Sequence, residues 1–209
     1  GKTRETLKIY DPYYCAGSMK KHLNSLGFTS VYNEREDFYQ MLANDNLPDH
    51  DVVVTNPPYS QDHVEKLLTF CGCQDKPFLL LMPNYVCAKP YFYPLLKYDG
   101  SLQKLSLKIG KEVEVAKIQT FRKNGPIFLV PKKRYNYWTP KAMRAKSSVQ
   151  AHASELGHRT SPFVSFWYVD LEPICNRNEV KTMNGKGVIQ LMYFENLHDL
   201  PISVKPTKK

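Results

Sequence analysis

The sequence has 209 residues, of which 42% are hydrophobic and 23% charged, with a formal net charge of +9. This length fits one domain with its own core, and the apolar fraction excludes a disordered chain. No apolar run approaches the ~20 residues that cross a bilayer and no leader opens the sequence, so neither a membrane protein nor a secreted one is expected. The five cysteines favour reduced thiols in an intracellular protein, of the nucleus or the cytoplasm. Cys71 and Cys73 are the only close pair and lack further ligands nearby, so no metal is expected.

The positive charge is concentrated in one stretch of the sequence. Residues 1–96 carry 9 Lys or Arg and 11 Asp or Glu, for a net charge of −2. Residues 97–159 carry 14 Lys or Arg and 4 Asp or Glu, for a net charge of +10. Residues 160–209 carry 6 Lys or Arg and 5 Asp or Glu, for a net charge of +1. A basic block in an otherwise balanced chain indicates a phosphate-rich partner such as a nucleic acid. A solvated lysine-rich face is an equal alternative on charge alone.

Hydrophobic patterning predicts alternating strands and helices over the first hundred residues. Ser18 is expected to cap the first helix, which Gly27 ends. The β-branched run 51–55 and the apolar run 77–82 are typical of strands buried on both faces. The expected elements, in chain order, are 7–10, 18–26, 30–32, 51–55, 62–71 and 77–82.

The second half of the sequence is less regular. Strands are expected at 125–130 and 161–168 as additions to the same sheet, and the polar stretch 141–160 is expected to connect them and to order on a partner. The repeated strand and helix order predicts an α/β fold. Its sheet is expected to be mostly parallel, with helices on both faces and an antiparallel edge at its C-terminal end.

The most specific motif is Asn56-Pro57-Pro58-Tyr59, directly after the apolar strand 51–55. Ligands of an open parallel sheet bind beyond the carboxyl ends of its strands, which is where this tetrapeptide is expected. The Asn56 side chain and the Pro57 carbonyl can both accept hydrogen bonds from one planar NH₂ group, and the two prolines keep the turn stiff. Tyr59 adds an aromatic face for a planar ring. The alternative interpretation is an ordinary turn.

A second motif follows the first predicted strand, in the stretch 11–18. Asp11 can hold a cationic ammonium group, and Gly17 allows the backbone to approach a ligand closely. The helix that begins near Ser18 offers N–H groups to a carboxylate. A zwitterionic amino-acid group fits this turn better than a diphosphate, because phosphate loops carry two or three glycines.

The two turns resemble the motifs of class I S-adenosylmethionine-dependent amino-methyltransferases, closely over residues 7–90 and more loosely over 125–170. In that family an Asp-Pro-Tyr-like turn holds the methionine part of the cofactor, and an Asn-Pro-Pro-Tyr turn holds the target nitrogen. The resemblance implies a Rossmann-like methyltransferase fold, S-adenosylmethionine as the cofactor, and an enzyme of the EC 2.1.1 class. It does not fix the substrate, because enzymes acting on adenine N6, guanine N2 and protein glutamine share the motif.

The resemblance also implies roles for individual residues. Asn56, Pro57, Pro58 and Tyr59 would be catalytic, through direct transfer of the methyl group to a nitrogen held by Asn56 and the Pro57 carbonyl. Two sets of residues would bind the cofactor: Asp11, Tyr13, Cys15 and Gly17 around its methionine part, and Asn33, Glu34, Asp37 and Phe38 around its ribose and adenine. The second set is more closely spaced than in the family, so it stays open which carboxylate reaches the ribose. The alternative interpretation of residues 34–37 is the solvated start of a helix.

Cations and aromatic residues alternate in the basic block, directly after the strand 125–130. Cations neutralise phosphates and aromatic rings stack on unpaired bases, so this segment is the expected substrate-binding site. An edge strand with inward-facing aromatics is the alternative. The residues are Lys132, Lys133, Arg134, Tyr135, Tyr137 and Trp138.

These observations predict one methyltransferase domain over 1–209. It comprises a cofactor-binding and catalytic half (7–96), a basic substrate-binding half (97–170) and a C-terminal extension (171–209). The expected substrate is an exocyclic amine of a nucleic-acid base, foremost adenine N6 in RNA, with a cap-adjacent nucleotide as one target. Guanine N2 in RNA, adenine N6 in DNA and protein glutamine are alternatives, as is a catalytically silent subunit that binds RNA or a partner protein. Further domains or protein subunits outside these 209 residues are expected as partners. A membrane is not expected as a partner.

Overall fold

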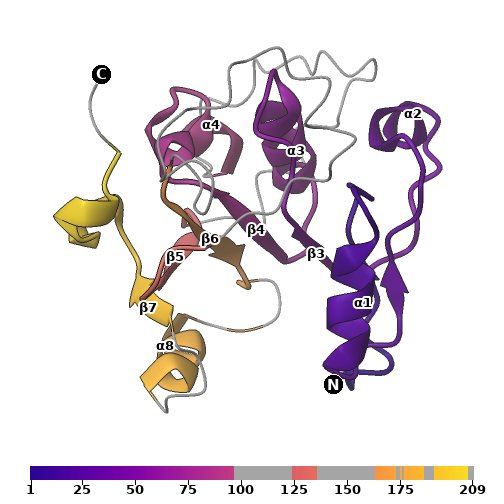
Figure 1. The fold of residues 1–209 in the computed structure, drawn as a ribbon, viewed down its shortest axis with the longest axis horizontal. Coiled ribbons are helices and arrows are strands. Elements are labelled where there is room, and N and C mark those ends of the chain that lie inside the picture. Colours follow the sequence, from indigo (N-terminus) through magenta and orange to yellow (C-terminus); the bar gives the residue numbers. More distant parts are fainter. Residues whose placement is uncertain (97–123, 136–162, 173–174, 176, 186–190, 207–209) are drawn as a thin grey trace.

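One mixed β-sheet organises the computed structural model, which describes residues 1–96, 124–135, 163–172, 175, 177–185 and 191–206. Within these ranges seven strands pair in the order β2-β1-β3-β4-β6-β5-β7 (Figure 1). The strands are β1 (Ile9–Tyr10), β2 (Val31–Tyr32), β3 (Val52–Thr55), β4 (Phe78–Pro83), β5 (Ile127–Pro131), β6 (Ser165–Asp170) and β7 (Leu191–Phe194). The chain therefore has an α/β fold, as the sequence predicts.

Strand direction changes along the sheet. The four strands β2, β1, β3 and β4 are parallel, whereas β6 is antiparallel to both β4 and β5, and β7 is antiparallel to β5. It follows that β5 runs in the same direction as β4. The expectation of a mostly parallel sheet with antiparallel pairing toward its C-terminal end is confirmed. Antiparallel pairing occurs inside the sheet, where β6 lies between β4 and β5, as well as at the edge formed by β7.

Helices cover both faces of the sheet. One face carries α1 (Ser18–Ser25) and α8 (Arg177–Gly185); the other carries α2 (Phe38–Ala43), α3 (His63–Gly72) and α4 (Phe92–Leu96). The connection from β1 to β2 leads toward one edge of the sheet. The next connection, from β2 to β3, passes over β1 toward the opposite edge. Because such crossovers are right-handed, α1 and α2 must lie on opposite faces. Three short 3₁₀ turns complete the described elements: Asn84–Ala88, Leu197–Asp199 and Ile202–Val204.

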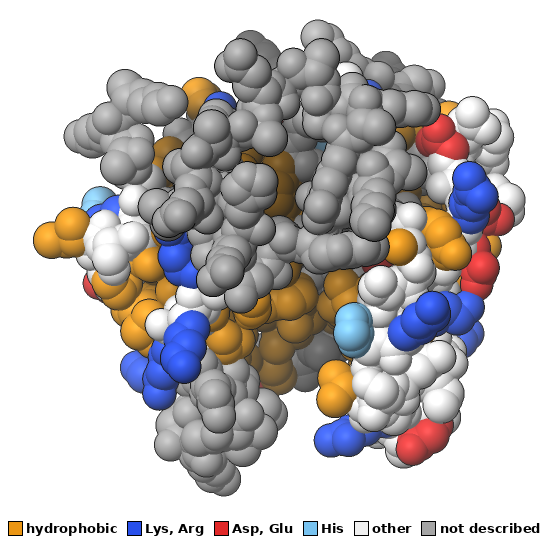
Figure 2. Space-filling model, in the orientation of Figure 1, with side chains coloured by type: hydrophobic (Ala, Val, Ile, Leu, Met, Phe, Trp, Pro, Cys, Tyr) orange, Lys and Arg blue, Asp and Glu red, His pale blue; other side chains and the backbone are white. Residues whose placement is uncertain are grey.

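Side chains of β4 alternate between the two faces of the sheet. Phe78, Leu80 and Met82 are fully buried against α3 and α4, in the larger core of the protein. Leu79 points to the opposite face and remains partly exposed, although it contacts the smaller cores beneath α1 and α8. Figure 2 shows hydrophobic side chains in a hollow on this second face, between α1 and the strands at the far end of the sheet.

One expectation about local structure needs correction, one alternative agrees with the structure, and one expectation lies outside the described residues. Ser18 does not cap α1: it is the first helical residue, and the N-cap is Gly17 in a left-handed conformation, with no side-chain hydrogen bond. The helix α2 starts at Phe38, in agreement with the alternative interpretation of residues 34–37 as a helix start, because the Asp37 side chain accepts hydrogen bonds from Tyr39 N and Gln40 N. The stretch 141–160 lies outside the described residues. Among those that are described, no helix has the length and apolar character to cross a bilayer.

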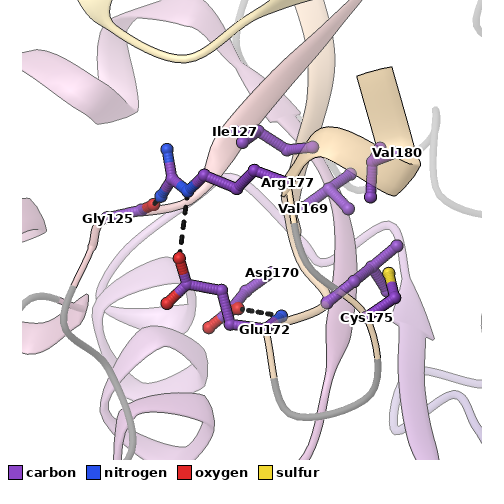
Figure 3. A pocket seen from close by; sticks show the side chains of 9 residues that line it. Gly125, Ile127, Val169, Asp170, Glu172, Cys175, Arg177 and Val180 are labelled. Carbon is purple, nitrogen blue, oxygen red and sulfur yellow. Dashed lines mark hydrogen bonds and ion pairs between the residues drawn. The ribbon is translucent and has the colours of Figure 1, made fainter. Parts of the chain in front are cut away.

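Arg177, at the start of α8, joins the segment after β6 to the segment before β5 (Figure 3). Its Nε donates to Glu172 Oε1 at 3.0 Å, and its NH2 group donates to the Gly125 carbonyl oxygen. Asn124 Nδ2 donates to the same Glu172 oxygen at 2.7 Å. These contacts border a cavity of about 10 Å³, the size of one water molecule. They hold this end of the sheet through charged hydrogen bonds that are mostly shielded from solvent.

Replacing Arg177 by Ala is expected to destabilise the fold without altering the site described below. A hydrogen-bonded charge pair of this kind contributes roughly 1.5–3 kcal/mol, which corresponds to a fall in Tm of roughly 3–12 °C in a chain of this size. Thermal unfolding followed by circular dichroism measures the change, with the exposed Lys181→Ala on the same helix as the control. An equal loss in both variants would mean that the Arg177 contacts contribute nothing beyond the helix itself.

Candidate functional site

The two predicted motifs lie side by side at one edge of the sheet. β2 lies on one side of β1 and β3 on the other, so the strand order reverses between β1 and β3. This is the position at which open α/β sheets bind ligands, beyond the carboxyl ends of the strands. Asp11 directly follows β1 and Asn56 directly follows β3. We refer to this edge as the carboxyl edge.

Asp11 connects the ends of three neighbouring strands. Its side chain is 4% exposed, and its Oδ1 accepts a hydrogen bond of 2.5 Å from Thr55 Oγ1 and one of 3.3 Å from Tyr13 N. Asn33, the residue after β2, donates from Nδ2 to Asp11 Oδ2 at 3.0 Å and to its carbonyl oxygen at 3.2 Å. Thr55 immediately precedes Asn56, so a single hydrogen bond links the two sequence motifs.

Burial raises the pKa of the Asp11 carboxyl to about 7, and the hydrogen bonds from Thr55 and Tyr13 only partly oppose this shift. Among the described residues no Lys, Arg or His forms an ion pair with Asp11. A buried carboxylate without a cationic partner is costly to ionise, and a positively charged ligand would relieve that cost. Asp11 is therefore suited to hold an ammonium group.

Asn33 leaves one buried acceptor without a partner. The residue is 1% exposed, and its Oδ1 has no hydrogen-bond partner in the described part of the chain, although its Nδ2 forms two hydrogen bonds. Buried polar atoms are nearly always hydrogen-bonded in native proteins, so an unpaired oxygen beside Asp11 suggests a donor that a ligand supplies. Hydroxyl and ammonium groups are both suitable donors.

The 11–17 turn has an unusual backbone. Cys15 and Gly17 both have positive φ angles, of 49° and 67°, and Gly17 N donates to the Tyr14 carbonyl oxygen at 2.7 Å. A Cβ atom on Gly17 would lie 3.2 Å from the Tyr14 ring. Glycine is therefore required at position 17 both by its conformation and by the close ring. Cys15 is exposed, and the Tyr13 side chain is half-buried within the turn.

Gly17→Ala is expected to weaken ligand binding at this turn as well as stability. An alanine with positive φ costs roughly 1–2 kcal/mol, and the Tyr14 ring must also move. Gly27→Ala is a matched control, because Gly27 has a φ of 91° at the other end of α1 and its Cβ would meet only the flexible Arg4 side chain. Both variants should lower Tm. S-adenosylhomocysteine is the probe that the sequence resemblance suggests for this turn. If the turn belongs to a ligand site, only Gly17→Ala should weaken binding of the probe in calorimetry, whereas equal affinities of the two variants would mean that the turn is not part of the site.

In the 56–59 turn the Asn56 side chain is open to solvent and is held by a hydrogen bond from Tyr59. The Asn56 side chain is exposed and Pro57 is buried. The Tyr59 hydroxyl has one proton and two acceptors, Asn56 Oδ1 and the Leu81 carbonyl oxygen of β4, the latter at 3.1 Å. Tyr59 thus orients the Asn56 side chain through its hydroxyl group, a contact that the sequence motif did not reveal.

Two further aromatic residues lie beside Tyr59. The Phe163 ring packs edge-on against Tyr59, with centroids 5.4 Å apart, and against Tyr85, with centroids 5.7 Å apart. Phe163 precedes β6 and Tyr85 follows β4, so three segments distant in sequence form one aromatic wall at the carboxyl edge. Phe163 could not be predicted as a site residue from the sequence, because no local motif surrounds it.

The remaining predicted cofactor residues lie in different environments. Glu34 is exposed and forms an ion pair of 2.5 Å with Lys20 of α1. Asp37 caps α2, as described above. Phe38 is 3% exposed and packs in the core against Tyr10, with centroids 6.5 Å apart, so its ring offers no surface to a ligand. The structure therefore joins Asn33 to Asp11 by hydrogen bonds, whereas Glu34 and Asp37 have other partners and Phe38 packs edge-on against the Tyr13 ring, with centroids 5.6 Å apart.

A hydrogen-bonded chain of three rings borders the site, and no feature of the sequence indicates it. Tyr13 Oη lies 3.1 Å from Tyr39 Oη, which lies 2.5 Å from His63 Nδ1. Burial raises the pKa of both tyrosines above the usual value, so both hydroxyls stay protonated. The chain ties the 11–17 turn to α2 and to the start of α3, which fixes the position of the turn beside Asn56.

The basic segment that follows β5 also leaves the sheet at the carboxyl edge, because β5 runs in the same direction as β4. Lys132, Lys133 and Arg134 are exposed. Tyr135 is half-buried and its hydroxyl accepts a 2.9 Å hydrogen bond from Trp167 Nε1 of β6, which makes it part of the fold. Tyr137 and Trp138 lie outside the described residues.

No cluster of three or more His, Cys, Asp or Glu side chains that could hold a metal ion occurs in the described part of the chain. Comparison of the sequence with models of protein families, with curated proteins and with solved structures gives no match in any of the three. Interpretation of the site therefore depends on its own geometry and chemistry.

Proposed function

We propose that this protein is an S-adenosylmethionine-dependent methyltransferase that modifies an exocyclic amino group of a nucleic-acid base, adenine N6 in RNA. The observation that carries the proposal is the hydrogen bond between Thr55 and Asp11. It joins a buried carboxylate, which has no cationic partner among the described residues, to an exposed Asn-Pro-Pro-Tyr turn at the reversal point of the strand order. Such a pair of turns is suited to bringing a cationic amino acid and a planar amine together.

The residues of the 11–17 turn fit the methionine part of the cofactor. Asp11 would hold its ammonium group, which is consistent with the raised pKa of the Asp11 carboxyl and with the unpaired Oδ1 of Asn33 nearby. The N-terminus of α1, which no side chain caps, would hold its carboxylate. When bound, S-adenosylmethionine supplies an activated methyl group on a sulfonium.

The 56–59 turn fits the acceptor. Asn56 Oδ1 and the Pro57 carbonyl would accept the two hydrogens of the amine, which frees the nitrogen lone pair for attack. The Tyr59 hydroxyl would support this step. When the Tyr59 hydroxyl donates its hydrogen bond to the Leu81 carbonyl oxygen instead, Asn56 Oδ1 becomes available to accept a hydrogen bond from the amine. The wall of Phe163 and Tyr85 would offer faces or edges to the flat base.

The sheet is consistent with a Rossmann-like methyltransferase fold. Its parallel part has the strand order 2-1-3-4, which places the two turns next to each other, and helices cover both faces. This arrangement occurs in proteins of many functions, so it supports the proposal only together with the residues at the carboxyl edge.

RNA is favoured as the substrate by the basic segment at the same edge. Three strand spacings separate β3 from β5, which places Lys132 and Lys133 about 14 Å from the 56–59 turn along the edge. Cations at that distance can hold phosphates of the strand that carries the target base. They would add affinity but no sequence preference.

Replacing Lys132 and Lys133 together by Ala is expected to weaken RNA binding and to flatten its dependence on salt. Each phosphate that the protein no longer neutralises reduces the slope of log K against log salt by roughly 0.7 for a single strand. Fluorescence anisotropy with a labelled single-stranded RNA at 50–300 mM NaCl measures both quantities. A double variant at Lys20 and Lys21, on α1, is the control for net charge. An unaltered slope in the Lys132 and Lys133 variant would exclude these lysines from the RNA site.

The experiment that tests the function is methyl transfer from tritiated S-adenosylmethionine to separate RNA, DNA and protein fractions. Digestion of the labelled RNA and chromatography of its nucleosides should give N6-methyladenosine. Label in N2-methylguanosine or N6-methyldeoxyadenosine would move the target to another base or nucleic acid, and label in protein glutamine would replace the nucleic-acid assignment. Cofactor binding without transfer to any fraction would indicate a catalytically silent subunit.

A further inference from the structure

The turn after β4 carries an aromatic ring and a cation beside the 56–59 turn. Tyr85 lies in the 3₁₀ turn Asn84–Ala88, which directly follows β4, and Lys89 ends this turn. Lys89 Nζ lies over the Tyr85 ring, 5.8 Å from its centre. Because β4 pairs with β3, the turn lies one strand spacing, about 4.8 Å, from the 56–59 turn along the carboxyl edge.

Asn84 holds two other segments at the same place. Its backbone N donates to the carbonyl oxygen of Val164, just before β6, at 2.8 Å. Its Nδ2 donates to the carbonyl oxygens of Val204, at 3.0 Å, and of Lys205, at 3.3 Å. One residue therefore fixes the segments that carry Phe163 and Lys205 beside the turn after β4, although both are distant from it in sequence.

Phe163 and Tyr85 keep part of their rings open to solvent. Their centroids are 5.7 Å apart and their planes are perpendicular, at 90°. Both side chains are partly exposed. An edge-on contact covers one ring face at most, so a flat base can still stack on this pair. Such a base would lie next to the place proposed for the target base, which is at Asn56.

The charges along the carboxyl edge differ on the two sides of the 56–59 turn. On the side of β4 and β5, the segments 84–89, 132–135 and 202–206 carry five Lys or Arg and no Asp or Glu. On the side of β1 and β2, the segments 11–17 and 33–37 carry four Asp or Glu and one Arg. A polyanion is therefore attracted to the first side of the turn and repelled from the second.

The lysines of the first side can bind phosphates. Lys89 is exposed, and neither Lys89 nor Lys205 forms an ion pair within the part of the chain that the structure describes. Lys205 Nζ donates to the His198 carbonyl oxygen at 2.9 Å, which leaves its other hydrogens to a ligand. Lys132 and Lys133 follow at about 14 Å from the 56–59 turn. At about 3.4 Å per stacked nucleotide, this distance corresponds to roughly four nucleotides.

We propose that Tyr85, Phe163 and Lys89 bind the nucleotide next to the target in a single-stranded RNA, on the side of the target that faces β6 and β5. Its base stacks on the two rings, its phosphate pairs with Lys89, and the strand continues toward the other cations of this side. The inference rests on the proposed function for the place of the target base at Asn56. It makes the substrate a strand of several nucleotides, held on one side of the target, rather than a free nucleotide.

The test uses RNA hexanucleotides of uridine that contain one adenosine and, next to it, one pyrrolocytosine, a fluorescent base without an exocyclic amino group. Stacking on an aromatic side chain quenches this base. The full chain should quench it when it lies on one side of the adenosine and leave it bright when it lies on the other. Quenching on neither side, or equally on both, would overturn the proposal. Tighter binding of the corresponding DNA strand would identify DNA as the partner and overturn it as well.

Variants of the two rings locate the stacking. Tyr85→Leu removes the ring and keeps an apolar side chain against the core, and it should weaken binding of the quenched hexanucleotide roughly 5- to 100-fold. Tyr85→Phe keeps the ring and should retain the quenching. Phe163→Leu should act as Tyr85→Leu does, and it serves if that variant is poorly folded. Full quenching in both leucine variants would overturn the proposal.

A variant of the cation tests the phosphate contact. Lys89→Ala changes an exposed residue and should reduce the slope of log K against log salt by roughly 0.7. Lys21→Ala, at an exposed lysine of α1, is the matched control and should keep the wild-type slope. Equal slopes in the two variants would remove Lys89 from the subsite and overturn the proposal.

Methyl transfer to the same hexanucleotides separates this inference from the proposed function. Transfer to the adenosine without one-sided quenching would retain the function and overturn the subsite. One-sided quenching without transfer would support the subsite as an RNA-binding site and overturn the proposed function.

Discussion

Asn56→Ala is expected to reduce methyl transfer by about 10²–10³-fold while the affinity for S-adenosylhomocysteine stays within about threefold of the wild type. The reason is the position of Asn56: it is exposed after β3 and contacts the Tyr59 hydroxyl, but the structure gives it no hydrogen bond with Asp11. The variant removes one of the two acceptors proposed for the amine and leaves the 11–17 turn intact. Single-turnover rates and calorimetry measure the two quantities separately.

Two further variants separate the chemical role of Asn56 from a structural one. Ser60→Ala, at an exposed residue next to the turn, should keep full activity. Tyr59→Phe keeps the ring against Phe163 and removes only the hydroxyl, so kcat should fall about tenfold with little change in KM. If Asn56→Ala lost cofactor affinity as strongly as rate, Asn56 would belong to the cofactor site and the proposed acceptor role would be wrong.

Asp11→Asn should weaken S-adenosylhomocysteine binding at pH 8 by roughly 10- to 100-fold, because a charged hydrogen bond contributes roughly 1.5–3 kcal/mol. The pH dependence makes the prediction specific. The pKa of the Asp11 carboxyl is about 7, and only the ionised form attracts an ammonium group. Wild-type affinity should therefore rise about tenfold between pH 6 and pH 8, whereas the affinity of the variant should stay constant. An affinity at pH 8 that Asp11→Asn leaves unchanged would exclude Asp11 as the ammonium partner.

The same substitution is expected to stabilise the unliganded protein at high pH. The folded-state pKa of Asp11 lies above the ordinary value, so ionisation opposes folding as pH rises from about 4 to about 7, and the cost is fully present above that range. The neutral amide of the variant avoids this cost, and the Asn33 amide can rotate so that its unpaired Oδ1 accepts from the new side chain. Tm of Asp11→Asn should exceed the wild-type Tm at pH 8 and approach it near pH 4, as measured by calorimetry without ligand.

Much of the sheet follows from local sequence. The apolar runs at 51–55 and 77–82 contain β3 and β4 to within one residue at each end, because a strand covered by helices must be apolar along its whole length. The helix α3 also agrees, since its apolar side chains recur at the helical period. α2 was not expected from periodicity, because it has only six residues and begins through a cap at Asp37.

The candidate site could be predicted only in part. Asn56 and Asp11 are found by their place after apolar strands, which is a local property of the chain. Thr55 and Phe163 could not be found in this way, because each matters through a residue distant in sequence. Phe38 shows the converse: the family resemblance suggested a ligand contact, but the Phe38 ring belongs to a core that forms only when α2 packs on the sheet.

By itself the sequence determined the strands, the two turns and the chemistry that their side chains can perform, because these depend on residue type and on spacing along the chain. The tertiary structure decided which of those residues meet. It placed β1 beside β3, buried the Asp11 carboxyl, and turned the Tyr59 hydroxyl toward Asn56. The pKa of a carboxyl and the orientation of an amide depend on neighbours that strand pairing brings close, and local sequence does not specify that pairing.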